Sequence, residues 1–243
     1  MIATAEIAQE QDLWMWLPHL IQVSDPLFPT GGYAHSLGLE EWAATCNYKD
    51  KQDLVTFFEE HVACSLTRLE LPYLHFIIQL LDKEQIDWQQ IKRLDSEINA
   101  WKWASEIREA SLAQGRGRLR LLKKLWTNES IMQDYEEQAK ELGFYGHHLL
   151  ITAIQFKILG VPLRAGLLAY GYQSFANFSS ASIKLLRMSP ESVQGALLHG
   201  LSLLPEIVDK ALVVEHDDAG YFMPHFDIAC ARHSTAFSRL FIS

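Results

Sequence analysis

The sequence predicts an all-α fold, and the spacing of its apolar residues is the main reason. Side chains that recur at intervals of three and four, as on one buried face of an amphipathic helix, include Phe57, Phe58, His61, Val62, Ser65, Leu66 and Leu69. Alternation of β-branched and polar residues with a period of two, which is typical of strands, is not sustained over any long segment. We therefore expect a helical bundle of roughly nine to ten helices.

In chain order, the periodic segments predict helices over 12–22, 34–47, 51–81, 88–126, 130–141, 145–159, 163–187, 190–204 and 224–238. Asp50 or Asp53 is placed to cap the helix that begins at residue 51, and Asp87 the helix that begins at residue 88. Glycine and proline indicate the breaks at 143–146, 160–162, 189–190 and 215–224.

Small residues are spaced along one side of the segment after residue 103. Ala104, Ser111 and Gly115 permit a second helix to approach closely. Gly115 and Gly117 each cost about 1 kcal/mol relative to alanine inside a helix, so they indicate tight packing or a local kink. The same segment holds a basic cluster of Arg116, Arg118 and Arg120. We favour a solvated helix face for this cluster over a docking patch for an acidic partner.

Composition indicates a folded, acidic protein. Of the 243 residues, 49% are apolar and 21% charged, which suffices for a sizeable core. No linker or repeat of fixed period divides the chain, so we expect one domain over 1–243, with 1–11 as a flexible N-terminal segment and 239–243 as a C-terminal tail. The net charge of −9 argues against general nucleic-acid binding.

The cysteines and the N-terminus favour a cytoplasmic location. Cys46, Cys64 and Cys230 are an odd number without a CxxC pair, which favours a reducing compartment. The opening MIATAEIAQEQDLW lacks the basic start of a secretory signal. No run of about 18 uncharged apolar residues exists, so we expect no association with a membrane.

Catalytic motifs are missing from the sequence. Gly31-Gly32 is followed by no lysine and preceded by no strand, so it does not predict a phosphate-binding loop. Neither HExxH nor GxSxG occurs. Carboxylates are numerous, but no acid/base pair can be inferred from their positions. These observations favour a binding protein over an enzyme.

Histidines suggest a metal site only weakly. His147 and His148 are adjacent, so they cannot share one face of a helix. A second group, whose spacing matches no metal-binding template, comprises His216, His225, Cys230 and His233. We favour structural roles for these residues over a stable zinc or nickel site, while transient passage of a metal stays open.

Two long segments resemble the urease accessory protein F (UreF) family. The run Leu20-Ile-Gln-Val-Ser-Asp-Pro-Leu-Phe-Pro-Thr-Gly-Gly-Tyr-Ala-His-Ser-Leu-Gly-Leu-Glu40 is similar to the family's N-terminal signature. The end, His233-Ser-Thr-Ala-Phe-Ser-Arg-Leu-Phe-Ile-Ser243, resembles its closing pattern, and Glu109-Ala-Ser-Leu-Ala-Gln-Gly-Arg116 falls between them in the expected order. The sequence departs from the family pattern at 184–190, which affects the contacts expected of that region.

The resemblance implies a non-catalytic, all-helical homodimer that bridges the urease accessory protein D (also called H) and the GTPase accessory protein G. It also implies that this complex delivers nickel to apo-urease at the expense of GTP. Nickel and GTP would then be handled by the partner complex, and this chain would bind no cofactor stably.

The family further implies candidate roles for particular residues. The GTPase side is expected to contact Tyr33, His35, Ser36 and Glu40. The D/H side is expected to contact the tail through Arg239, Leu240, Phe241 and Ser243, and the dimer interface to include Tyr170 and Tyr172. Two alternatives stay open: a direct nickel metallochaperone that uses the histidine and cysteine group near the C-terminus, and a helical enzyme with a site at the 23–40 loop and His147 or His148.

Overall fold

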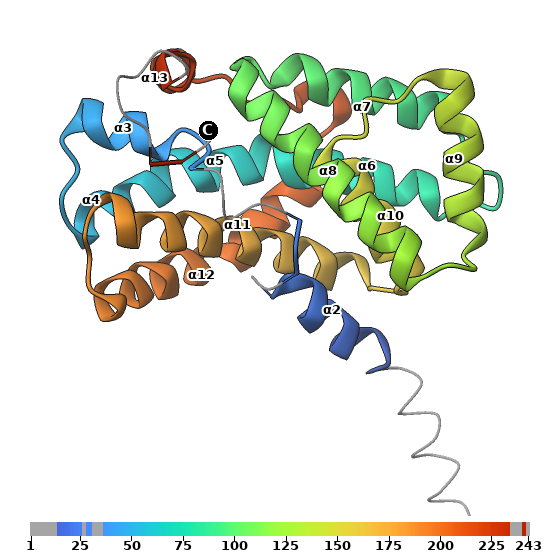
Figure 1. The fold of residues 1–243 in the computed structure, drawn as a ribbon, viewed down its shortest axis with the longest axis horizontal. Coiled ribbons are helices and arrows are strands. Elements are labelled where there is room, and N and C mark those ends of the chain that lie inside the picture. The colour runs from blue at the N-terminus through green and yellow to red at the C-terminus, as the bar shows by residue number, and fades with distance from the viewer. Residues whose placement is uncertain (1–13, 26–27, 31–35, 234–239, 242–243) are drawn as a thin grey trace, which may run out of the picture.

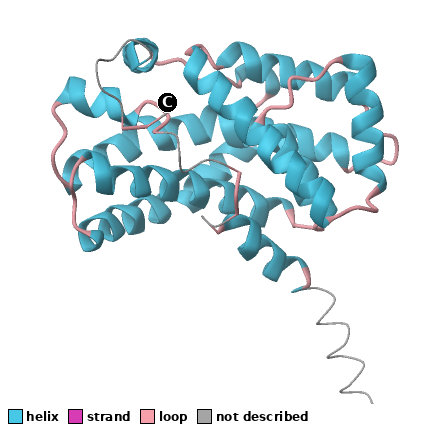
Figure 2. Ribbon diagram, viewed as in Figure 1, coloured by secondary structure: helices cyan, strands magenta, loops and turns pink. Residues whose placement is uncertain are grey.

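The computed structural model describes residues 14–25, 28–30, 36–233 and 240–241, and the segment 1–11 lies outside them. Every regular element in the described residues is a helix (Figure 2), which confirms the predicted fold class. In chain order they are α2 (Trp16–Ser24), α3 (Leu39–Cys46), α4 (Lys51–Phe57), η2 (Phe58–Val62), α5 (Ala63–Ser65), η3 (Leu66–Glu70), α6 (Leu71–Leu81), α7 (Trp88–Trp101), α8 (Ser105–Leu125), α9 (Ser130–Leu142), α10 (His148–Ile158), α11 (Leu163–Leu185), α12 (Pro190–Leu212), η4 (His216–Asp218) and α13 (Pro224–His233).

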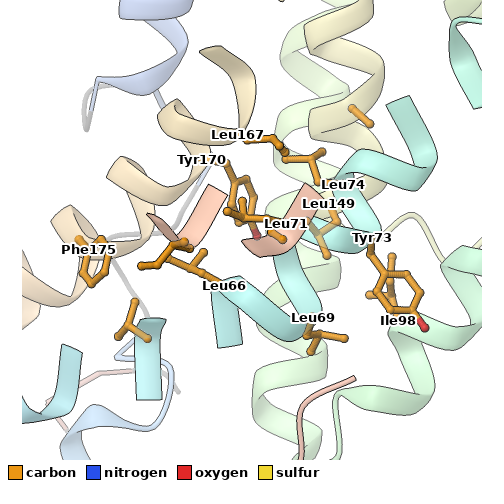
Figure 3. Packing of buried hydrophobic residues seen from close by; sticks show 14 of the residues in the cluster. Leu66, Leu69, Leu71, Tyr73, Leu74, Ile98, Leu149, Leu167, Tyr170 and Phe175 are labelled. Atoms are coloured by element: carbon orange, nitrogen blue, oxygen red, sulfur yellow. The ribbon is translucent and has the colours of Figure 1, made fainter. Parts of the chain in front are cut away.

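The core lies around α6 and α10. Helix α6 packs against α7, α10, α11 and α12, and α11 and α12 run side by side (Figure 1). Every residue of α10 from Leu149 to Phe156 is buried, as expected for a helix enclosed on all sides. Figure 3 shows Tyr170 of α11 beside Leu66 and Leu71. Among the described residues, no helix is long and apolar enough to cross a membrane.

The predicted helix 51–81 is a continuous helical rod from α4 to α6. Asp50 caps it, because its carboxylate accepts the N–H groups of Gln52 at 2.8 Å and Asp53 at 3.1 Å. Asp53 completes the capping box by accepting the N–H of Asp50 at 3.1 Å. Two π-helical turns, η2 and η3, interrupt the regular α-helical spacing of this rod.

The prediction of one helix over 88–126 is wrong, because the chain leaves the helix at 102–104. Asp87 does cap α7, accepting the N–H of Gln90 at 2.9 Å. The break turns Lys102 inward, where its Nζ lies 2.9 Å from Oε1 of Glu70. The guanidinium of Arg108 donates to the freed carbonyl of Lys102 at 3.1 Å. A distant contact, from Glu70, and a nearby one, from Arg108, thus stabilise a break that no glycine or proline marks.

The predicted end of the 190–204 helix is also wrong. Helix α12 continues through Pro205 to Leu212, although proline in a helix interior costs about 3 kcal/mol. Ile207, Val208 and Ala211 extend the buried face beyond the proline, and burial of aliphatic side chains offsets such a cost. By contrast, α9, α10 and α11 begin and end within a few residues of the predicted bounds.

Candidate functional site

A tight turn, Ser36–Gly38, positions the start of α3. Leu37 has a φ of 50° and Gly38 a φ of 92°, both in the left-handed region. A Cβ at Gly38 would collide with Sγ of Cys230 and approach the ring of Phe226, both on α13. Glycine is therefore required at residue 38 for its backbone conformation and for the close approach of α13.

Glu40, in the first turn of α3, holds the C-terminal tail. One carboxylate oxygen accepts the N–H of Leu240 at 2.8 Å, and the other accepts the N–H of Phe241 at 3.2 Å. Hydrogen bonds to an ionised acceptor are stronger than those between neutral groups. Leu240 and Phe241 accordingly lie beside the first turn of α3. The structure thus joins the two segments for which separate partner roles were predicted.

The other predicted partner contacts lie in different environments. Tyr33, His35, Arg239 and Ser243 lie outside the described residues. Ser36 is fully buried rather than part of an exposed polar surface, because the turn that follows it packs against α13. In the tail, Leu240 is 65% exposed, whereas Phe241 packs partly against the hydrophobic core. Binding of partners by these residues stays a prediction.

The two tyrosines predicted at a dimer interface differ in exposure. Tyr170 is 7% exposed, and its hydroxyl donates to Oε2 of Glu70 at 2.6 Å, so its side chain belongs to the interior. Tyr172 is only partly buried. Of the pair, Tyr172 is therefore the residue placed to contact a second molecule, and the dimer itself stays a prediction.

The weak metal candidates are not brought together in the described part of the chain. Nε2 of His216 lies 2.8 Å from Oε2 of Glu97, and His225 is exposed. Cys230 is 2% exposed, and burial raises the pKa of its thiol well above the ordinary value. The side chain of His233 lies outside the described residues. In the described ranges, no group of three or more His, Cys, Asp or Glu side chains is arranged to hold a metal.

A buried ion pair that sequence reasoning missed joins the rod to the 102–104 break. The side chains of Lys102 and Glu70 are 9% and 17% exposed, and Tyr170 donates to the same carboxylate. Burial by itself would raise the pKa of Glu70, but Lys102 and the Tyr170 hydroxyl hold it below the ordinary value. The three residues are far apart in sequence, and only the unforeseen helix break directs Lys102 inward.

A second polar cluster fixes the loop that precedes α10. The carboxylate of Asp95, fully buried on α7, accepts the N–H groups of Tyr145 at 2.6 Å, Gly146 at 3.1 Å and His147 at 3.2 Å. The ring of His147 is also fully buried, with Nδ1 3.0 Å from Oγ of Ser111. His147 is therefore enclosed by structural contacts. This placement gives no support to the hypothesis of an enzyme that uses it.

We expect His147 to make stability depend on pH. Burial, with Lys102 nearby, lowers the pKa of His147 in the folded chain to about 3, from its ordinary value of 6.5. As the pH falls below about 6.5, the unfolded chain binds a proton that the folded chain excludes, so the free energy of unfolding decreases down to about pH 3. Between pH 7 and pH 5 the loss from this one residue is about 2 kcal/mol.

Urea unfolding of the wild type and of His147→Asn at both pH values measures this loss. Asparagine retains hydrogen-bonding capacity but does not titrate, so the drop should be smaller in the variant by about 2 kcal/mol. An equal decrease in the free energy of unfolding of both proteins would show that His147 is not the cause of the decrease.

Comparisons with known proteins agree on one family. The family model described as UreF matches residues 48–200. The chain is 25% identical to the urease accessory protein UreF of Paenarthrobacter aurescens, over 92% of this chain and 96% of that protein. It is 28% identical to the urease accessory protein F of Arabidopsis thaliana, over 91% of this chain and 90% of that protein. With the urease accessory protein UreF of Actinobacillus pleuropneumoniae it shares 24% identity, over 92% and 97% of the two chains.

Proposed function

Because the chain belongs to the UreF family of urease accessory proteins, we propose that it is a non-catalytic scaffold in urease maturation. In this role it bridges the accessory protein D/H and the GTPase accessory protein G in the cytoplasm. The assembled complex inserts nickel into apo-urease, coupled to GTP hydrolysis by the GTPase. Nickel is the cargo of the complex rather than a resident cofactor of this chain.

The observation that supports this proposal is the contact of Glu40 with the tail. Leu240, the predicted D/H contact, presents a side chain that is 65% exposed, while its backbone N–H is bound to Glu40. Glu40 is the predicted GTPase contact. A D/H protein that binds the tail therefore changes the hydrogen bonds of the Glu40 carboxylate, which the GTPase is expected to contact. Binding of D/H and binding of the GTPase are thus coupled through the contact between Glu40 and the tail.

We also propose that the scaffold is a homodimer. Helix α11 presents the side chains of Leu168, which is 38% exposed, and of the partly buried Tyr172 four residues further on. Residues at this spacing share one face of a helix. An aromatic and an aliphatic side chain together fit the composition of interface cores. Light scattering on the purified chain and on its complexes measures the number of copies.

Capture of the partners tests the bridging role. We expect the full-length chain to form a complex with D/H, and this complex to bind the GTPase. A chain that ends at residue 239 should bind D/H about tenfold more weakly or worse, because it lacks Leu240 and Phe241 and the two N–H groups that bind Glu40. Its helical circular dichroism should change little. Isothermal titration calorimetry or biolayer interferometry measures the affinities.

Glu40→Gln and Glu41→Gln are matched variants that test the contact with the GTPase. Both residues lie in the first turn of α3, but only Glu40 is hydrogen-bonded to the described tail residues Leu240 and Phe241. Glu40→Gln should weaken recruitment of the GTPase to the preformed D/H complex, whereas Glu41→Gln should not. Failure of the full-length chain to bind either partner would overturn the scaffold proposal. Equal behaviour of the two variants would overturn the role of Glu40 alone.

A further inference from the structure

A cavity of about 160 Å³ lies inside the molecule, beside the 102–104 break. The two π-helical turns of the rod, the inner faces of α8 and α11, and α13 line it. The residues of α8 that line the cavity include Ile107, Ser111 and Gln114, which are spaced so that they share one face of the helix. π-Helical turns occur frequently at functional sites, because they change the direction of the side chains that follow.

The cavity has an aromatic wall and a polar wall. Phe57, Phe178 and Phe226 provide apolar surface. Glu70 and Lys102 line the polar wall as an ion pair whose Nζ and Oε1 are 2.9 Å apart, so their charges balance. A concave apolar space with a few convergent polar groups is the usual form of a small-molecule site.

Gln114 is one of several polar side chains of the cavity wall that have no hydrogen-bond partner among the described residues. Both ring nitrogens of His61 and Nδ1 of His148 are buried without one. Gln114 is 7% exposed, and its amide, to which no other described residue is hydrogen-bonded, lies at the cavity surface. Gln173, which lines the same cavity, donates its amide N–H to the carbonyl of Val23 at 2.9 Å. An amide that faces a cavity and is bonded by no other described side chain is available to a ligand that completes its hydrogen bonds.

The cavity also approaches the surface. Trp103, in the helix break, lines it and is 65% exposed. The ring of Phe222, 54% exposed, lies 5.6 Å from the ring of Trp103. These two aromatic side chains mark the point where a small molecule can enter.

We propose that this cavity binds a small uncharged molecule with an aromatic body and a planar polar head that carries neighbouring donor and acceptor atoms. A carboxamide has such a head, because its N–H and C=O groups match the C=O and N–H groups of the Gln114 amide. The charges of Glu70 and Lys102 offset each other, and Asp227, the other carboxylate of the lining, disfavours an anionic head. A cavity of about 150 Å³ accommodates benzene, so the aromatic ring of such a ligand fits in this cavity of about 160 Å³. This binding is separate from the scaffold function and requires no partner protein.

Benzamide is the probe for this site, and toluene, which lacks the polar head, is the matched control. Trp101 and Trp103 both line the cavity, so their fluorescence should report binding to the full-length chain. We expect saturable binding of benzamide with a Kd of about 1 mM or below. Gln114→Leu should weaken benzamide about tenfold, through loss of the hydrogen bonds to the amide, and leave toluene unchanged.

Two further measurements distinguish recognition by Gln114 from general damage to the fold. Without ligand, Gln114→Leu should change the melting temperature little, because the Gln114 amide makes no hydrogen bond to another described residue, whereas Gln173→Leu should lower it. Retained toluene binding shows that the cavity of the variant is intact, and Gln114→Met replaces Gln114→Leu if the latter does not fold. Absence of saturable benzamide binding up to about 10 mM, or equal benzamide affinity in the wild type and the Gln114 variant, would overturn the proposal.

Discussion

Replacing Gly115 by alanine is expected to lower the free energy of unfolding by about 3 kcal/mol. The added methyl group would collide with the carbonyl oxygen of Gly146, which belongs to the loop that Asp95 holds in place. Backbone cannot move aside as a flexible side chain does, so either α8 or this loop must shift. For a chain of this size the melting temperature should fall by roughly 6–12 °C, as scanning calorimetry would measure.

The sign of this effect is informative, because helix propensity predicts the opposite. Alanine in a helix interior is favoured over glycine by about 1 kcal/mol. Gly195→Ala in α12 is the matched control: its new methyl group would meet only the flexible side chain of Lys51, whose nearest atom, Nζ, lies at 2.9 Å. We expect that variant to be neutral or more stable by up to about 1 kcal/mol. Stabilisation by both substitutions would contradict the close contact at Gly115.

The elements set by local sequence were predictable. The amphipathic stripe from Phe57 to Leu69 and the Asp50 cap predicted the rod at 51–81, and both are present. The small residues of α8 predicted a close approach by another segment, and α10 with its preceding loop lies there. Periodicity and capping depend on residues within one or two turns of each other, which is why sequence reveals them.

What sequence reasoning missed depends on contacts between distant residues. The break at 102–104 is stabilised by Glu70 and Arg108, and α12 continues past Pro205 because its buried face continues. At the candidate site, both end segments were predicted to be partner surfaces, and that prediction is still to be tested. Their mutual contact through Glu40 joins residues 200 positions apart, which no local pattern indicates. The unpaired amide of Gln114 becomes visible only when its surroundings are known.

Replacing Lys102 by methionine is expected to destabilise the fold by about 3–5 kcal/mol, because it leaves the carboxylate of Glu70 buried without its cation. Methionine preserves most of the volume of the lysine stem, so the loss reports the charge rather than a cavity. The Tyr170 hydroxyl, which donates to Glu70 at 2.6 Å, remains as a partner. Chemical denaturation at pH 7 measures the change.

The double variant Lys102→Met/Glu70→Gln determines whether the unpaired charge is the cause. Glutamine has an oxygen that accepts from Tyr170 and carries no charge, so the double variant should be more stable than Lys102→Met alone by about 2 kcal/mol. The single variant should also recover stability as the pH falls toward 5. Without Lys102, burial raises the pKa of Glu70 above its value in the unfolded chain, so the folded state binds the extra proton. Two results would contradict this account: additive effects of the two substitutions on the free energy of unfolding, and a loss of stability in Lys102→Met that does not depend on pH. Lys102 and Glu70 would then form a packing contact rather than an electrostatic link between the rod and the helix break.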